Sequence, residues 1–207
     1  MTDAGFWNRM AEKYAARPVD DEAAYQAKLE KTRALLTLDS RVIEFGCGTG
    51  TTALHHAPFA KNILATDISE KMIEIAWSKA QAAGIENVTF DVAGLEAPDL
   101  TDHSFDIVMM HSLLHLFRDR QHAIDRAYDL LKPGGCFVAS TTCLSGLMRM
   151  LQPALTVARW FGAVPYVAFF TQRQLIADLR STGFEIVEEW LPERHKAVFT
   201  IARKPQG

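Results

Sequence analysis

The stretch that decides the fold reads Val42-Ile43-Glu44-Phe45-Gly46-Cys47-Gly48-Thr49-Gly50. An apolar run leads into three glycines at alternate positions, which predicts a buried strand followed by a tight turn into a helix. A second apolar run, residues 62–66, ends at Asp67. Because ligands in open α/β sheets bind beyond the carboxyl ends of the strands, we expect the glycine loop and Asp67 to border one site. Asp67 would accept hydrogen bonds from ribose hydroxyls there.

The spacing of the glycines distinguishes between nucleotide cofactors. The dinucleotide fingerprint is G-x-G-x-x-G, whereas the third glycine of this chain arrives one position early, at Gly50, and Thr51 follows it. This spacing fits a pyrophosphate less well. It therefore argues against an NAD-dependent oxidoreductase, which we keep as a less favoured alternative.

The rest of the chain alternates apolar strands with helices. Residues 105–110 and 136–140 predict two further strands, and residues 119–131 predict the helix between them, ended by the turn at residues 132–135. Strands of this kind alternating with helices indicate a mostly parallel sheet with helices on both faces, an α/β fold. Residues 184–191 and 197–202 predict two last strands, whose short connection favours an antiparallel hairpin.

Two segments lie outside this alternation. Residues 1–38 predict two helices separated at Arg17-Pro18. Residues 144–170 are apolar and aromatic, with interrupting glycines and prolines. They could form a substrate cap, a dimer interface, core packing or a peripheral membrane contact, and the sequence leaves these alternatives open.

The composition bounds the class of protein. The 207 residues carry a net charge of -3 without a basic block, which argues against nucleic acid as a partner. The three cysteines form no CxxC pair, so a reducing compartment fits best. The N-terminus has no signal-peptide core, and no apolar run is long enough to span a membrane. We expect a single cytoplasmic domain over residues 1–207, monomeric or homodimeric.

Four segments together resemble a known family. Residues 42–50, 65–69, 104–108 and 130–135 are similar, in order, to the motifs of the class I S-adenosylmethionine-dependent methyltransferases. The small group that includes the ubiquinone and menaquinone biosynthesis enzymes is the most similar. The resemblance implies a Rossmann-like seven-stranded sheet of order 3-2-1-4-5-7-6 with strand 7 antiparallel. It also implies S-adenosylmethionine as cofactor, S-adenosylhomocysteine as product, and residues 1–38 as a helical lid.

The resemblance assigns roles to individual residues. The three glycines would pack against the methionine part of the cofactor, Glu44 would support their loop, and an aromatic residue of the N-terminal helix, Tyr14, would fold over the cofactor. Ile68 and Met72 would lie near the adenine or simply pack in the core. The cofactor-binding set is Tyr14, Glu44, Gly46, Cys47, Gly48, Gly50, Asp67, Ile68, Met72, Gly94, Leu95 and His111.

One position departs from the family pattern. Family members often carry an acid after the third strand that binds the adenine amino group, and Gly94 stands at that position here. Backbone groups of Ala93, Gly94 or Leu95 can replace that acid, with Glu96 as a weaker candidate.

Two histidines follow the fourth strand, at the edge where the cofactor is expected. His111 or His115 could act as a general base on the acceptor. The alternative is that one borders the cofactor and the other packs. Their spacing is half of an HExxH zinc motif, but Ser112 replaces its glutamate, so no metal is expected. His55 and His56 are predicted to lie away from the chemistry.

The sequence thus predicts a methyltransferase that acts on a small, hydrophobic acceptor, with the acceptor atom unresolved. A non-catalytic module that binds S-adenosylmethionine or a partner is the main alternative, because binding and catalysis are separable.

Overall fold

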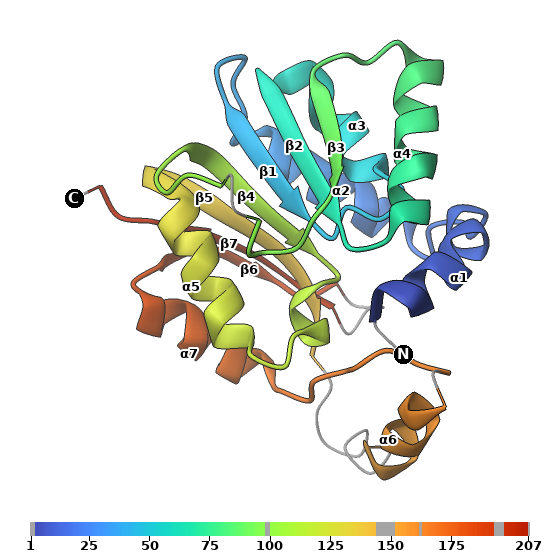
Figure 1. Cartoon of the computed structure of the whole chain (residues 1–207). Helices are drawn as coiled ribbons and strands as arrows, with labels where there is room; N and C mark the ends of the chain where they lie inside the picture. The colour runs from blue at the N-terminus through green and yellow to red at the C-terminus, as the bar shows by residue number, and fades with distance from the viewer. Residues whose placement is uncertain (1–2, 98–99, 144–151, 162, 193–196, 207) are drawn as a thin grey trace.

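The computed structural model describes residues 3–97, 100–143, 152–161, 163–192 and 197–206. These residues form a seven-stranded sheet of order β3-β2-β1-β4-β5-β7-β6 (Figure 1). The strands are β1 (Arg41–Phe45), β2 (Asn62–Asp67), β3 (Val88–Val92), β4 (Phe105–His111), β5 (Leu131–Thr142), β6 (Glu185–Trp190) and β7 (Ala197–Arg203). Only β7 runs antiparallel to its neighbours, β5 and β6. The predicted strand order and terminal hairpin are confirmed.

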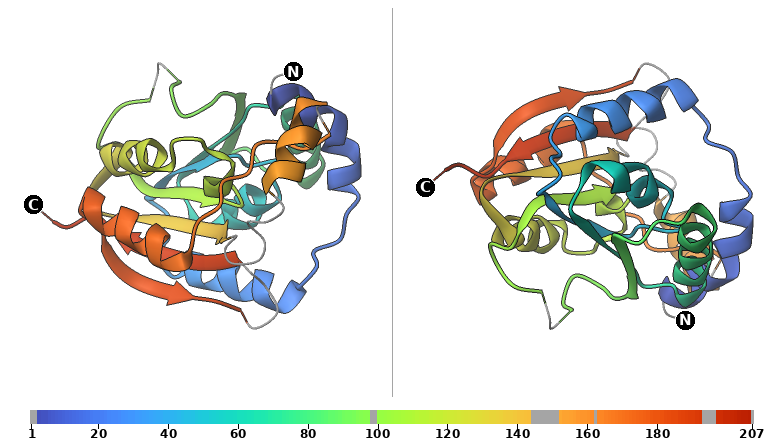
Figure 2. Two further views of the ribbon diagram at one scale, coloured as in Figure 1. Left: turned by 90° about the horizontal axis from the view of Figure 1, so that it is seen from below. Right: turned by 90° about the horizontal axis from the view of Figure 1, so that it is seen from above.

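Helices cover both faces of the sheet (Figure 2). The helices are α1 (Asp3–Ala15), α2 (Glu22–Arg33), α3 (Thr51–His56), α4 (Glu70–Ala83), α5 (Arg120–Leu130), α6 (Gln152–Trp160) and α7 (Gln172–Thr182), with short 3-10 turns η1 (Ala57–Phe59) and η2 (Leu114–Leu116). Alternate strand residues supply the two cores. Ile43 and Val108 face α5 and α7, whereas Val42 and Ile107 face α3 and α4. This arrangement confirms the predicted parallel sheet between two helical layers.

Local signals determine where these helices begin and end. The Ser69 hydroxyl caps α4 at its start and Gly84 ends α4 in the left-handed conformation. Thr171 and Gln174 form the capping box of α7. Trp77 of α4 is 41% exposed. Its indole N–H bonds to the Phe90 carbonyl at 3.2 Å, so the ring lies along the edge of the sheet.

The turn at residues 132–135 was placed wrongly. We predicted that it ends a helix at Leu131 and that a strand begins at Cys136. In the structure α5 ends at Leu130, and Leu131 already pairs with Phe105 of β4. The register shifts before the next pair, so the intervening glycine turn bulges from β5 instead of preceding it.

The two N-terminal helices reach different parts of the molecule. The break at Arg17-Pro18 is confirmed, because α1 ends before it and α2 starts after it, capped by Asp21. α1 packs on α4 (Figure 1), while α2 runs beside β6 and β7 (Figure 2, right). Lys31 of α2 forms an ion pair with Glu188 of β6.

Part of the apolar segment 144–170 lies outside the described residues, namely 144–151 and 162. Beyond these gaps, α6 carries Trp160, which is 90% exposed, and is followed by the exposed Phe161. Phe170 is buried under the Arg120 guanidinium. Across the residues that the structure describes, no helix has the length and apolarity to span a membrane.

Candidate active site

The glycine loop joins β1 to α3 at the carboxyl edge of the sheet. Gly46, Gly48 and Gly50 have φ values of 64°, 54° and 74°, which residues with a side chain rarely adopt. A Cβ atom at Gly46 would lie 2.8 Å from a Leu113 methyl carbon, and one at Gly50 would lie 2.6 Å from the Phe90 ring. At Gly48 it would meet only the Tyr14 ring, at 3.6 Å. Gly46 and Gly50 are therefore required by packing, whereas a methyl group at Gly48 would make only an ordinary van der Waals contact.

Asp67 is bound firmly to the backbone at the end of β2. One carboxylate oxygen accepts the Gly48 N–H at 3.0 Å, and the other accepts the Ser69 N–H at 2.9 Å. Burial raises the pKa of Asp67, and these backbone donors oppose the rise. Each carboxylate oxygen retains a further lone pair, and Asp67 lines a cavity. The carboxylate can thus accept hydrogen bonds from a ligand without losing its position.

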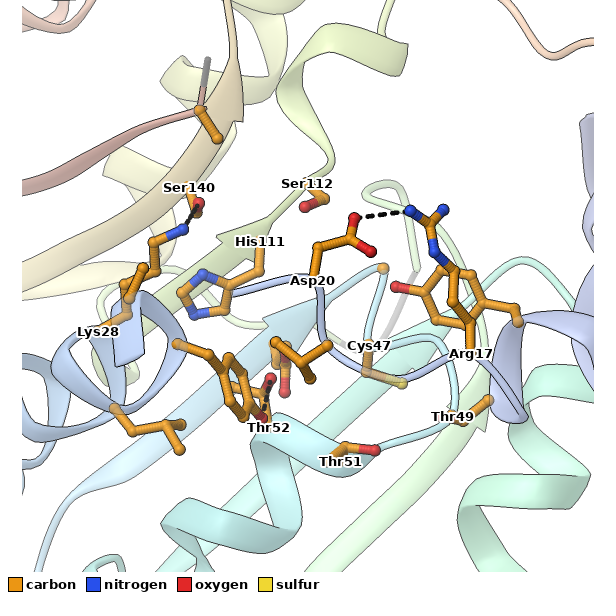
Figure 3. Close-up of a pocket in the computed structure, with 18 of the residues that line it drawn as sticks. Arg17, Asp20, Lys28, Cys47, Thr49, Thr51, Thr52, His111, Ser112 and Ser140 are labelled. Carbon is orange, nitrogen blue, oxygen red and sulfur yellow. Dashed lines mark hydrogen bonds and ion pairs between the residues drawn. The ribbon is translucent and has the colours of Figure 1, made fainter. Parts of the chain in front are cut away.

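Two adjoining cavities lie over this edge. The smaller has a volume of about 310 Å³ and a largely apolar lining that includes Trp7, Ile68, Met72, Leu95, Leu113, Phe117 and Tyr166. The larger, about 570 Å³, lies under α2 and is lined by more polar side chains (Figure 3). The two cavities share Tyr14, Gly46, His111, Ser112 and His115. One elongated ligand can therefore occupy both.

Most of the predicted site residues lie at these cavities. Those that border the smaller one are Tyr14, Gly46, Gly48, Asp67, Ile68, Met72, Gly94, Leu95, His111 and His115. Glu44 and Cys47 border the larger one. Gly50 borders neither, because it is the N-cap of α3 and packs against Phe90 and Ala76. Gly50 thus closes the loop onto β3 and α4, and its contact with a cofactor stays a prediction.

Glu44 is a buried acid beneath the loop. Burial raises the pKa of Glu44 to about 8, and a backbone hydrogen bond at Ala53 opposes the rise. One of its carboxyl oxygens, Oε2, has no hydrogen-bond partner. The side chain is thus protonated at neutral pH unless a cationic group approaches.

His111 and His115 both face the shared part of the cavities. Burial lowers the pKa of each imidazole to about 4. Nε2 of His111 and Nδ1 of His115 are buried without hydrogen-bond partners. Both rings are therefore neutral at pH 7 and can accept a proton, but only weakly, because a strong general base has a pKa near the working pH. In the described part of the chain, no group of three His, Cys, Asp or Glu side chains could hold a metal.

Ser112 aligns these histidines and was not predicted. It adopts a positive φ of 52°, and its N–H bonds to the Ser140 carbonyl of β5 at 2.6 Å. This left-handed turn ends β4 and leads directly into η2, which carries His115. Nothing in a lone serine signals such a turn.

Comparison with known proteins identifies the domain. The family model described as "Methyltransferase domain" matches residues 42–135. This stretch contains a methyltransferase domain. An uncharacterized methyltransferase, YcgJ of Bacillus subtilis, is 33% identical over 138 residues, 67% of this chain and 54% of YcgJ. The ubiquinone/menaquinone biosynthesis C-methyltransferase UbiE of Zymomonas mobilis is 30% identical over 53% of this chain and 46% of its own length.

Solved structures agree on the fold of the methyltransferase domain. The crystal structure of YcgJ superposes with a TM-score of 0.72 at 19% identity, covering 88% of this chain and all of that one. The chain spans about half the length of the curated relatives it matches. The family resemblance based on the four motifs is confirmed.

Several residues of the larger cavity were not predicted. Lys28, Ser140 and Thr142 line it and lie outside the residues matched by the methyltransferase family model. His56, predicted to lie away from the chemistry, lines this cavity. α3 is a single short helix, so its last residue turns under α2 and lines the larger cavity, fully buried. His55 is exposed.

Proposed function

We propose that the chain is an S-adenosylmethionine-dependent methyltransferase that acts on a small molecule. The observation that carries the proposal is the pair of adjoining cavities beside Asp67 and Gly48 in a methyltransferase domain. The apolar cavity suits an adenosine group, and the shared region at His111 suits the reactive sulfur. The larger cavity leaves room for an acceptor.

The charges of the site fit this cofactor. S-adenosylmethionine carries a sulfonium, an ammonium and a carboxylate, so it is cationic overall. The acids Asp67 and Glu44 border the cavities, and the unpartnered Glu44 oxygen can receive a cationic group. The bound cofactor would supply an activated methyl group, so the protein mainly orients the acceptor and excludes water.

For the adenine, the backbone after β3 is open to the cavity. A Cβ atom at Gly94 would meet nothing closer than Ile68, at 4.0 Å. The Ala93 N–H already donates to the Asp67 carbonyl at 3.1 Å. We therefore assign the adenine contact to backbone groups of Gly94 and Leu95, in place of the acid found in other family members.

α1 would act as the lid. Tyr14 borders both cavities, and its ring lies over Gly48. Asn8 ties this helix to the start of α4, because its side-chain oxygen accepts the Ser69 hydroxyl at 2.6 Å. His111 and His115, which are neutral, would orient the acceptor or receive its proton.

Calorimetry and a turnover assay test the proposal. We expect S-adenosylhomocysteine to bind and NADH not to bind. Incubation with S-adenosylmethionine and a panel of phenols, amines, thiols, quinols and carboxylic acids should then release S-adenosylhomocysteine with at least one of them. Lack of S-adenosylhomocysteine binding would refute the proposal. Binding without turnover across the panel would favour the non-catalytic alternative.

A further inference from the structure

Lys28 places a positive charge inside the larger cavity. It lies on α2 one turn after Ala24 and one turn before Thr32, and all three residues line the cavity. Its ammonium donates a hydrogen bond to the Ser140 hydroxyl at 2.9 Å (Figure 3). Burial lowers the pKa of Lys28, and the Asp21 carboxylate opposes the fall. The fold therefore maintains an ammonium where solvation is reduced.

That ammonium has no ion-pair partner among the carboxylates that the structure describes. Lys31, nearly one turn further along α2, is paired with Glu188. An ammonium has three donors, and Ser140 takes one of them. Withdrawing a charge from water without a directly paired counter-charge is costly, so an anionic ligand would stabilise this ammonium.

No acid that borders the larger cavity forms an ion pair with Lys28, although the Asp21 carboxylate acts on its ammonium from a longer distance. Asp20 is paired with Arg17 at 2.6 Å. The Asp21 side chain caps α2. Glu44 forms no ion pair with Lys28, and burial raises its pKa to about 8, which disfavours its charged form. The nearby His111 is neutral, as its pKa is lowered to about 4.

The position of the Lys28–Ser140 pair separates it from the nucleoside site. Ser140 lies on β5, and Asp67 ends β2, with β1 and β4 between them. Three strand spacings correspond to about 14 Å. The pair thus lies across the shared region from Asp67, on the side where an acceptor would enter.

We propose that Lys28 and Ser140 bind a carboxylate on the methyl acceptor, so that the substrate is a small organic acid. This inference rests on the proposed function. The ammonium and the hydroxyl can each donate to one oxygen of a carboxylate, and a charge-assisted pair of this kind is stronger than a neutral one. A neutral analogue would leave the ammonium unpaired, which such sites reject strongly.

The test uses the full chain saturated with S-adenosylhomocysteine. Calorimetry compares matched carboxylates and amides: benzoate with benzamide, phenylacetate with phenylacetamide, and hexanoate with hexanamide. In the unsubstituted protein, at least one carboxylate should bind about tenfold to a hundredfold more tightly than its amide. Lys28→Met should abolish that preference, and Ser140→Ala should reduce it. Lys31→Met, the same change on the same helix outside the cavity, should leave it intact.

The outcomes separate the two proposals. Failure of S-adenosylhomocysteine to bind the unsubstituted protein refutes the proposed function. If it binds but no carboxylate is preferred, or if the preference survives in Lys28→Met, the acceptor inference is wrong. The remaining source of a carboxylate is the methionine part of the cofactor. If Lys28→Met weakens binding of S-adenosylhomocysteine but not of 5′-methylthioadenosine, Lys28 binds the cofactor and the inference is overturned.

Discussion

At the scale of single residues, Asp67 is the most sensitive position for cofactor binding. Each carboxylate oxygen of Asp67 accepts a backbone N–H, from Gly48 or Ser69. Asp67→Asn replaces one of these oxygens with an NH2 group, so one backbone N–H loses its acceptor. We expect S-adenosylhomocysteine affinity to fall about tenfold to a hundredfold, measured by calorimetry. Asp91→Asn, an exposed acid on β3, is the control. Unchanged affinity in the Asp67 variant would contradict the placement of the ribose.

Gly50 and Gly84 offer a matched pair of substitutions. Both have positive φ, 74° and 64°, so each alanine variant carries a conformational cost of about 1–2 kcal/mol. At Gly84 the new methyl meets nothing within 4 Å, whereas at Gly50 it collides with Phe90 and Ala76. We expect Gly50→Ala to reduce the free energy of unfolding by about 1–3 kcal/mol more than Gly84→Ala. Urea denaturation checks this, and equal losses would contradict it.

Residues predicted correctly at the cavities share a local signal. The glycines and Asp67 follow directly from strand ends, so the motif spacing alone indicates their position. Lys28 and His56 could not be predicted in this way. The contact between Lys28 and Ser140 joins residues 112 positions apart, and it depends on how α2 crosses the edge of the sheet. The packing of Gly50 against Phe90 could not be predicted either, because it depends on how β3 and α4 pack around the loop.

At the scale of elements, the attachment of α1 controls the lid. Asn8→Ala removes the acceptor for the Ser69 hydroxyl, although Ser69 still caps α4. We expect S-adenosylhomocysteine to dissociate about two- to tenfold faster, measured by stopped-flow fluorescence, with little change in melting temperature. Gln26→Ala, which removes an exposed side-chain bond within α2, is the control. Equal dissociation rates in the two variants would argue against α1 as a lid.

The caps and breaks of the elements could be predicted, but their packing could not. Ser69, Gly84 and the Thr171 capping box are determined by a few neighbouring residues. The helical periodicity of residues 1–38 does not indicate that α1 packs on α4 while α2 reaches β6. Nor does the apolar composition of α6 show that Trp160 is exposed.

At the scale of the whole molecule, the sheet was predicted from two kinds of information. The hairpin of β6 and β7 follows from the residues, because a five-residue connection cannot cross the sheet. The order of the first five strands came from the family resemblance, since alternating strands and helices are compatible with several parallel orders. The polar character of the larger cavity was not foreseen, because α2 supplies Tyr25, Lys28 and Thr32, which belong to no motif.

The buried titratable groups together predict how stability depends on pH. Burial lowers the pKa of His56 to about 3 and those of His111 and His115 to about 4. Since the unfolded imidazoles take up protons near pH 6.5, the unfolded state binds more protons below that pH. Stability is therefore fully present above about pH 6.5 and is lost as the pH falls towards 4.

Glu44 acts in the opposite direction. Because burial raises the pKa of Glu44 to about 8, the folded state retains a proton that the unfolded state releases, and stability declines as the pH rises from about 4.5 to 8. Burial also raises the pKa of Asp67, so three histidines outweigh two acids below pH 6.5, and Glu44 continues to lower stability as the pH rises towards 8. Urea denaturation should thus show maximal stability near pH 6.5. Below pH 6.5, the free energy of unfolding of His56→Leu should fall less steeply with pH, by up to about 1.4 kcal/mol per pH unit. His55→Leu, at an exposed position, should leave this slope unchanged. If the slope below pH 6.5 is unchanged in His56→Leu, this imidazole is not held neutral in the folded protein.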